Sequence, residues 1–213
     1  IVCLFIFSAA LAQNSDSFKV KANRLSQEFI IVDTHIDVPY RLHSRWEDIS
    51  QRTEGGEFDY VRAKEGGLNA PFMSIYVSAE RENNGARSLA DSLIDMVEDF
   101  VRRWPDKFVV AKSTADVSAQ FKQGKISLCM GMENGSPIEA KLENIKHFYD
   151  RGIRYITLTH GKDNHIGDSS YDTTHTWKGL SPFGKQVVAE MNRIGIMVDI
   201  SHVSDDVFSQ VMQ

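Results

Sequence analysis

The stretch IIVDTHIDV, residues 30–38, decides the fold class of this chain. Its isoleucine, valine and threonine residues are typical of a buried β-strand. Asp33, His35 and Asp37 interrupt it at every second position, and alternate positions of a strand point to the same side. Because buried charged groups are unfavourable unless they are paired, the pattern predicts a partner that compensates two carboxylates and an imidazole on one face.

Five further apolar runs predict strands, and amphipathic segments between them predict helices. The clearest helix lies at 86–104, and another begins with Ser181 as N-cap and Pro182 as its first residue. Alternation of strands and helices predicts the α/β class, with a parallel sheet covered by helices. The predicted strands span residues 30–36, 71–77, 107–111, 126–132, 153–159 and 196–202.

Two parallel architectures fit this alternation, an open doubly wound sheet and a closed (β/α)8 barrel. The open sheet favours a glycine-rich phosphate loop after the first strand, but here that strand ends in HIDVPY (35–40), without a glycine. Barrel active sites are built at the carboxyl ends of the strands. We therefore expect a (β/α)8 TIM-like barrel with a site on this rim. The polar residues that end the apolar runs are His35, Asp37, Glu133, His160 and His202.

Imidazole and carboxylate groups together favour zinc or a similar divalent metal as the compensating partner. His35 and Asp37 are expected to reach one ion, and Asp33, one step deeper, to orient His35 from the second coordination shell. Each residue alone has a simpler interpretation. Glu133, for example, could cap a helix, and His160 could be a hydrogen-bonded core histidine. The combination favours a metal site.

Length and composition describe one ordinary globular domain. The chain has 213 residues, of which 42% are hydrophobic and 25% charged. A formal net charge of -5 and the lack of a Lys/Arg-rich run give no support to nucleic-acid binding.

Both ends of the chain carry signals. Residues 1–12, an apolar run that closes with Ala10-Leu11-Ala12, are expected to be the remnant of a secretory signal peptide too short to span a bilayer, which predicts export. Cys3 would leave with this segment, and Cys129 is expected in the core without a disulfide partner. Residues 13–213 are then the N-terminal part of a single barrel domain. The helix after Ser204 lacks a stop signal before Gln213, so we expect a fragment.

Several motifs in order resemble the membrane (renal-type) dipeptidases, zinc-dependent peptidases of family M19 with a (β/α)8 barrel of the metal-dependent hydrolase type. The resemblance implies that His35 and Asp37 bind one zinc ion, that Glu133 bridges two, and that His202 binds the second. It also implies that His160 contacts the substrate and stabilises the tetrahedral intermediate. The motifs are VDTHIDVPY (32–40), FDYVRAKEGGLNAPFMSIYVS (58–78), GMENG (131–135), YDRGIRYITLTH (149–160) and GLSPFGKQVVAEMNRIGIMVDISHVS (179–204).

The implied reaction is hydrolysis of a dipeptide by a metal-activated hydroxide. Asn134 stands where many members have glycine. The family's second histidine on the second metal, its substrate-binding arginine and its late catalytic aspartate have no counterpart up to Gln213. We therefore expect a barrel truncated to about six strands, inactive by itself.

Other interpretations stay open. The protein could be a related barrel amidohydrolase that acts on another amide, such as a β-lactam or an acylated amino acid, or an exported metal-binding barrel without catalysis. Asn164, His165 and Asp168, in the long segment after His160, are candidates for a second-shell or substrate-facing role. A homodimer is compatible with the sequence, and membrane association would need an anchor that these residues do not contain.

Overall fold

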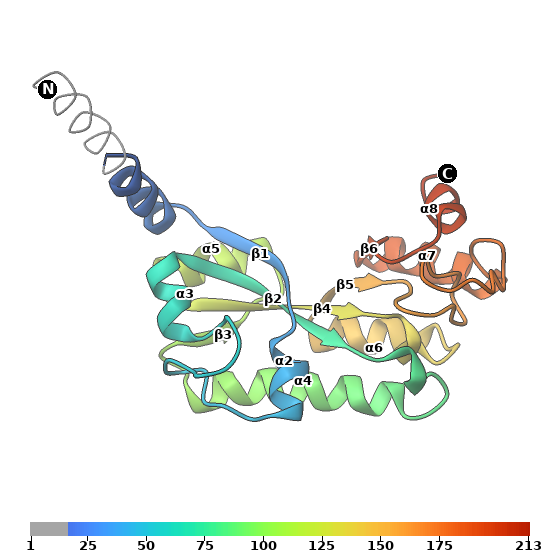
Figure 1. The fold of residues 1–213 in the computed structure, drawn as a ribbon, viewed down its shortest axis with the longest axis horizontal. Helices are drawn as coiled ribbons and strands as arrows, with labels where there is room; N and C mark the ends of the chain where they lie inside the picture. The colour runs from blue at the N-terminus through green and yellow to red at the C-terminus, as the bar shows by residue number, and fades with distance from the viewer. Residues whose placement is uncertain (1–16) are drawn as a thin grey trace, which may run out of the picture.

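The computed structural model describes residues 17–213 and has an α/β architecture built on one curved sheet (Figure 1). Every strand pairing in this part of the chain is parallel. The strand order is β1-β2-β4-β5-β6, and the short β3 pairs with the first three residues of β4. The strands are β1 Ile31–Ile36, β2 Leu68–Tyr76, β3 Phe108–Val110, β4 Ile126–Glu133, β5 Ile153–Thr157 and β6 Met197–Asp199.

The six predicted strands are all present, and the architecture is the curled parallel half of a β/α barrel, as predicted. The main difference is in length. β6 has three residues instead of the predicted seven, because the Asp199 carboxylate accepts the backbone N–H of Ser201 and turns the chain there.

Helices follow the strands. They are α2 Val38–Ser44, α3 Tyr60–Gly66, α4 Ala86–Arg103, α5 Thr114–Lys122, α6 Glu143–Arg151, α7 Pro182–Ile194 and α8 Asp205–Val211, with short 3-10 helices η1 Ala79–Arg81 and η2 Ser136–Ile138. Residues 17–28 form a helix that projects from the body (Figure 1).

The predicted helix starts are confirmed where a cap was visible in the sequence. The Ser181 hydroxyl accepts the backbone N–H of Gly184, and the Ser204 hydroxyl accepts that of Val207. Helices α2, α3 and α5 lie between predicted strands, where helices were expected, but their positions were not predicted. In α3, for example, Ala63 is the single fully buried residue, so no apolar periodicity marks the helix.

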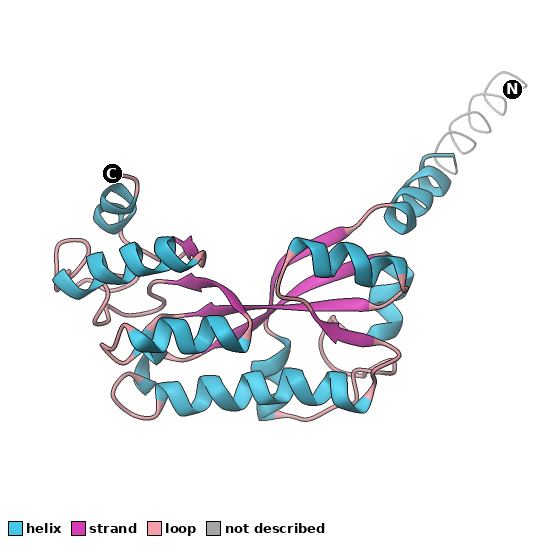
Figure 2. Cartoon of the chain, turned by 180° about the vertical axis from the view of Figure 1, so that it is seen from behind, coloured by secondary structure: helices cyan, strands magenta, loops and turns pink. Residues whose placement is uncertain are grey.

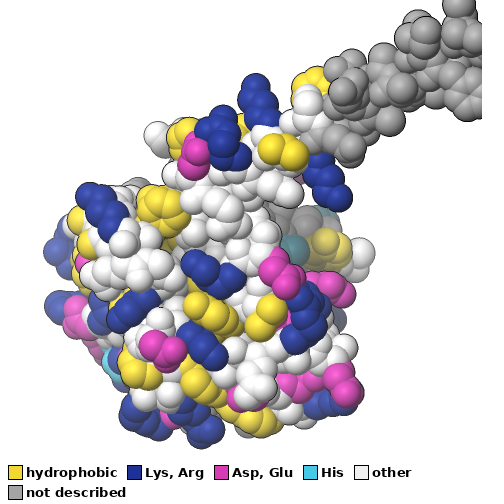
Figure 3. Space-filling model, turned by 90° about the vertical axis from the view of Figure 1, so that its left-hand side faces the viewer, with side chains coloured by type: hydrophobic (Ala, Val, Ile, Leu, Met, Phe, Trp, Pro, Cys, Tyr) yellow, Lys and Arg dark blue, Asp and Glu magenta, His cyan; other side chains and the backbone are white. Residues whose placement is uncertain are grey.

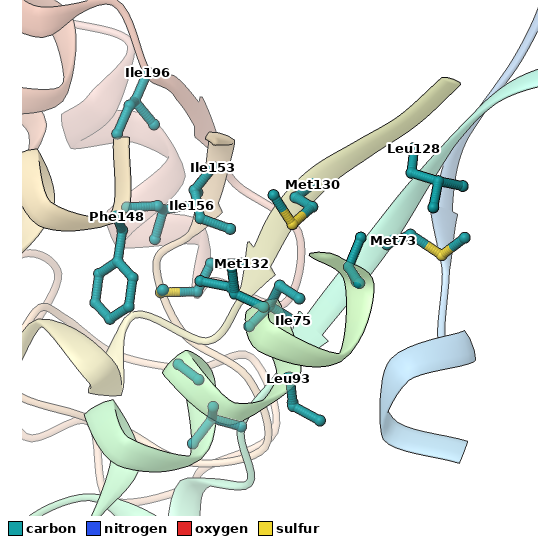
Figure 4. Close-up of a cluster of buried hydrophobic side chains, with 14 of the residues drawn as sticks. Met73, Ile75, Leu93, Leu128, Met130, Met132, Phe148, Ile153, Ile156 and Ile196 are labelled. Carbon is teal, nitrogen blue, oxygen red and sulfur yellow. The ribbon is translucent and has the colours of Figure 1, made fainter. Parts of the chain in front are cut away.

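The hydrophobic core lies between the outer face of the sheet and the helices that flank it (Figure 2). Ile75 of β2 and Met132 of β4 pack there with Leu93 of α4 and Phe148 of α6, and all four are fully buried (Figure 4). Cys129 lies buried in β4 as predicted, and burial raises its pKa to about 11. This core fixes the sheet edge that carries the site.

Strand β1 differs from its prediction as a buried, regularly alternating strand. Val32 is 49% exposed, and among the described residues β1 pairs with β2 alone. The pairing register shifts between Asp33 and Ile36, so alternation fails within the strand. His35 and Asp37 line the cavity on the inner face. Asp33 lines only a second cavity beside Arg41, which Asp37 also borders.

Within residues 17–213, no helix is both long and apolar enough to cross a bilayer. Basic and acidic side chains are interspersed over the face shown in Figure 3.

The contact between α7 and the segment before it predicts a large difference between two glycine substitutions. A Cβ atom at Gly184 would lie 1.9 Å from the backbone oxygen of Ile166, whereas a Cβ atom at Gly66 would meet nothing within 4 Å. Overpacking should therefore make Gly184→Ala lower the free energy of unfolding by about 2 kcal/mol or more. Gly66→Ala, the matched control in α3, should change it by less than about 1 kcal/mol. Chemical denaturation of both variants measures this, and equal effects would contradict the packing described here.

Candidate metal centre

The end of β1 supplies the first pair of polar side chains. His35 is the fifth residue of the strand, and Asp37 follows it as the N-cap residue of α2. The Nε2 atom of His35 lies 3.4 Å from Oδ1 of Asp37. The predicted pairing of these two side chains is therefore present at the carboxyl end of the first strand.

Glu133, the last residue of β4, is the buried centre of the site. Its side chain is 8% exposed, and each carboxylate oxygen faces a different set of groups. Oε2 lies 3.2 Å from Nε2 of His35 and accepts a 3.3 Å hydrogen bond from the Ser74 hydroxyl. Oε1 lies 3.2 Å from Nε2 of His202 and 3.5 Å from Nε2 of His160.

His202 reaches Glu133 from a loop that holds it in the left-handed backbone region, with φ 65°. Its backbone oxygen accepts hydrogen bonds from the Ser170 N–H at 2.9 Å and from the hydroxyls of Ser170 and Thr159 at 3.2 Å. Histidine adopts this region more readily than most residues, and three donors offset the strain. The long segment after β5 therefore fixes the backbone of this candidate ligand.

Two groups of ligand atoms result, and they share Glu133. One holds His35, Asp37 and Glu133, the other Glu133, His160 and His202, with the ligand atoms of each group within 4.8 Å of one another. Ligand atoms about 2.0–2.1 Å from a tetrahedral zinc ion lie about 3.3 Å apart. The four His–carboxylate distances in the site are 3.2, 3.2, 3.4 and 3.5 Å. These residues therefore fit a pair of divalent ions.

The charge balance of the site also favours bound cations. In residues 17–213, no Lys or Arg forms an ion pair with Asp37 or Glu133. Hydrogen bonds to Asp37 and then to Glu133 raise the pKa of His35 to about 10, so a proton supplies the balancing charge without a metal. Burial alone would raise the pKa of Glu133, but the hydrogen bond and charge of His35 outweigh it and the pKa is lowered. Burial is the main cause that lowers the pKa of His160.

The inner face of the sheet forms an open cavity of about 550 Å³. His35, Asp37, Glu133 and His202 line it, whereas His160 does not. Tyr155 also lines it, and its hydroxyl lies 2.7 Å from Nδ1 of His35. Tyr155 was not predicted as a site residue because it stands in an apolar run, although alternation along β5 places it on the same side as the lining residue Thr157.

The candidate residues of the long loop lie inside the loop rather than in the cavity. Asn164 is buried and bonds Asn134 and the Leu158 carbonyl through Nδ2. The Asp168 carboxylate accepts two backbone N–H groups of its own loop. His165 pairs with Glu82 at 2.8 Å. None of the three lines the cavity, so a contact with substrate stays a prediction.

Asn134 has the backbone conformation that explains the usual glycine at this position. Its φ is 78°, a region in which glycine is unstrained and asparagine is tolerated. The side chain is buried, donates to the Val77 carbonyl at 2.8 Å and accepts from the backbone N–H and hydroxyl of Ser136. The substitution therefore keeps the turn after Glu133 and adds hydrogen bonds beside it.

A curled parallel sheet with two metal-ligand groups on its carboxyl-end rim is the arrangement of a metal-dependent hydrolase of the β/α-barrel class. Residues 19–213 match the sequence profile of the membrane dipeptidases, peptidase family M19, and the chain belongs to this family. This confirms the resemblance found in the sequence.

Individual relatives of this chain are also named dipeptidases. The chain is 31% identical to an uncharacterised dipeptidase of Schizosaccharomyces pombe, over 90% of this chain and 51% of that protein. Identity to dipeptidase 3 of Macaca fascicularis is 30%, over 91% of this chain and 41% of the relative. The chain therefore spans about half the length of the curated relatives it matches.

Solved structures show the same fold. The probable dipeptidase PvdM of Pseudomonas aeruginosa superposes with a TM-score of 0.82 at 25% identity, over 90% of this chain and 51% of that one. A metallopeptidase of Rhodobacter sphaeroides, solved with a phosphinate mimic of the dipeptide L-Ala-D-Ala, gives 0.75 at 25% identity, over 86% and 61%.

The raised pKa of His35 predicts that metal binding releases a proton. At pH 7 the metal-free imidazole is charged, because its pKa is about 10, and only the neutral form is a ligand. The apparent metal affinity should therefore keep rising by about tenfold per pH unit above pH 7. Calorimetric titration of the full-length protein with zinc, in two buffers of different ionisation enthalpy, counts the protons released. An affinity that is flat above pH 7 would show that His35 is already neutral.

Proposed function

We propose that the full-length protein is a zinc-dependent dipeptidase that hydrolyses the peptide bond of dipeptides. The observation that carries this proposal is the division of the Glu133 carboxylate between two groups of ligand atoms. Membership of the membrane dipeptidase family supports the reaction class, and the dipeptide mimic bound to the Rhodobacter sphaeroides metallopeptidase supports the substrate class.

The ions would be held by residues from the ends of β1 and β4 and from the loop after β6. His35 and Asp37 would hold one ion and His202 the other, with Glu133 bridging the two. Nitrogen and carboxylate ligands suit zinc. When bound, two zinc ions supply Lewis-acid chemistry, since they polarise a carbonyl group and lower the pKa of water to about 7.

The chain's own groups would orient the dipeptide and meet the charge that develops on it. His160 is neutral at pH 7, because burial lowers its pKa, so one ring nitrogen can donate an N–H group. Tyr76 packs edge-on against this ring, with 4.9 Å between the ring centroids, and limits its rotation. We assign His160 the role of hydrogen-bond donor to the oxyanion of the tetrahedral intermediate. The cavity of about 550 Å³ has the size of a small-ligand site, which suits a dipeptide. His160 does not line it but lies behind His202, which does, with 4.6 Å between the ring centroids.

We also propose that the protein is exported. This rests on the apolar segment 1–12 and its Ala10-Leu11-Ala12 pattern, which lie outside the described residues. Detection of the mature N-terminus at Gln13 in the exported fraction of the cells would support it, and retention of residues 1–12 in a cytosolic protein would refute it. Inactivity of residues 13–213 alone and formation of a homodimer remain predictions.

Substitution of the shared carboxylate should affect both ions. Glu133→Gln replaces one bridging anion by a neutral amide, so the full-length protein should lose affinity for both zinc ions and lose dipeptide hydrolysis by about 10³-fold or more. Zinc content by atomic absorption and hydrolysis of several dipeptides and acylated amino acids, measured together, test this. A variant that keeps two tightly bound ions would contradict the bridging role.

His160→Ala separates the two roles that the geometry permits for this residue. If His160 donates to the substrate, zinc content stays unchanged and kcat falls by about 10²–10³-fold, the usual cost of one oxyanion donor. Release of one ion would instead make His160 a ligand alongside His202, 3.5 and 3.2 Å from the same Glu133 oxygen, and would refute the substrate role. Ala substitution of His43, which is exposed and outside both groups, is the control.

A further inference from the structure

The second ring nitrogen of His35 has a partner that the sequence did not predict. A histidine that binds a metal through one nitrogen usually donates the other N–H to an acceptor that fixes its orientation. Asp33 was expected in this role, but its Oδ1 accepts the backbone N–H of His35 at 3.1 Å. The Nδ1 atom of the ring lies 2.7 Å from the hydroxyl of Tyr155, which is 120 residues away in the chain.

The ring of Tyr155 is held in one orientation. The side chain is 7% exposed, and Phe72 packs against it with 5.5 Å between the ring centroids. On the neighbouring strand, a Cβ atom at Gly131 would lie 2.0 Å from the Tyr155 ring. Any larger residue at 131 would therefore displace the ring. The hydroxyl is placed from β5 across the inner face of the curved sheet to His35 on β1.

We propose that Tyr155 is a positioning residue for His35, and that Gly131 is required because it makes room for the Tyr155 ring; this rests on the metal site proposed above. The Nδ1–H group donates to the tyrosine oxygen, which leaves the Nε2 lone pair for the ion beside Glu133 and Asp37, at 3.2 and 3.4 Å. The reverse hydrogen bond, from the hydroxyl to Nδ1, would put the proton on Nε2 and block coordination.

Tyr155→Phe tests the proposal, because it removes the hydroxyl and keeps the ring that fills the space over Gly131. The full-length protein is titrated with zinc against a chromophoric chelator, which resolves the two binding constants. The ion held by His35, Asp37 and Glu133 should be bound about 10–100-fold more weakly in the variant. Tyr171→Phe is the matched control. The Tyr171 ring lies 5.7 Å from His202, but its hydroxyl makes no hydrogen bond within the described residues, so zinc affinity should change less than about twofold.

A double-mutant cycle assigns the effect to one ion. Asp37→Asn weakens the same ion directly, so adding Tyr155→Phe in that background should cost much less than in the wild type. A second measurement uses nitrogen NMR of His35 in the zinc-bound wild type, which should show the proton on Nδ1 and the metal on Nε2.

Each outcome decides between the proposals. A wild-type protein that binds no zinc would refute the proposed function rather than the role of Tyr155. Two bound ions with unchanged affinity in Tyr155→Phe would overturn this inference. An equal loss of zinc affinity at both sites, with a lower melting temperature of the metal-free protein, would show that Tyr155 only stabilises the fold. That result would also overturn this inference. If the variant does not fold, the spectrum of the zinc-bound wild type decides. A proton on Nε2 of His35 in that spectrum would overturn the role of Tyr155.

Discussion

The buried Glu133 carboxylate is the constraint on which the rest of the site depends. A buried anion is unfavourable without a compensating charge, and the described residues provide neither Lys nor Arg at hydrogen-bonding distance from it. Three imidazoles surround it instead, at 3.2 to 3.5 Å. Imidazole can carry a proton or accept a metal ion, so the site can hold balancing charge in either form. An arginine in the same place would neutralise the carboxylate permanently and leave no ligand function.

The curvature of the sheet brings residues that are far apart in the sequence together in one site. All strands run in parallel, so their carboxyl ends lie on one edge, and the curl brings β1 and β5 close across the inner face although they are not neighbours in the sheet. The outer face is anchored by the methionine and isoleucine residues packed under α4 and α6 (Figure 4). The inner face carries the polar groups of the site together with apolar side chains such as Phe72 and Val198. The positions of His35 and Tyr155 thus follow from the core on the opposite face of the sheet.

Much of this arrangement could be predicted because its signals are local. Ser181-Pro182 and Ser204 mark helix starts within a few residues. The polar residues that end the apolar runs lie at or within three residues of the strand ends, as Glu133 and His160 show. The parallel-sheet rule then collects those ends on one edge. The predictions that were wrong concern features that depend on packing between distant parts of the chain. The register shift in β1 arises from pairing with β2 and leaves no mark in an alternating sequence. Asp33 accordingly bonds the backbone of His35 and not its ring.

Two left-handed backbone positions show why the exact ligand geometry also lay beyond the sequence. Asn134 directly follows the bridging Glu133, and His202 is itself a candidate ligand; both have positive φ. Such positions are unfavourable for residues other than glycine by about 1–3 kcal/mol, so the surrounding structure must overcompensate them. Here it does so through one shared segment. The loop after β5 donates from Ser170 to the His202 carbonyl and from Asn164 to the Asn134 side chain. The same loop therefore holds the chain on both sides of the Glu133–His202 contact, and its buried polar residues supply the donors for it.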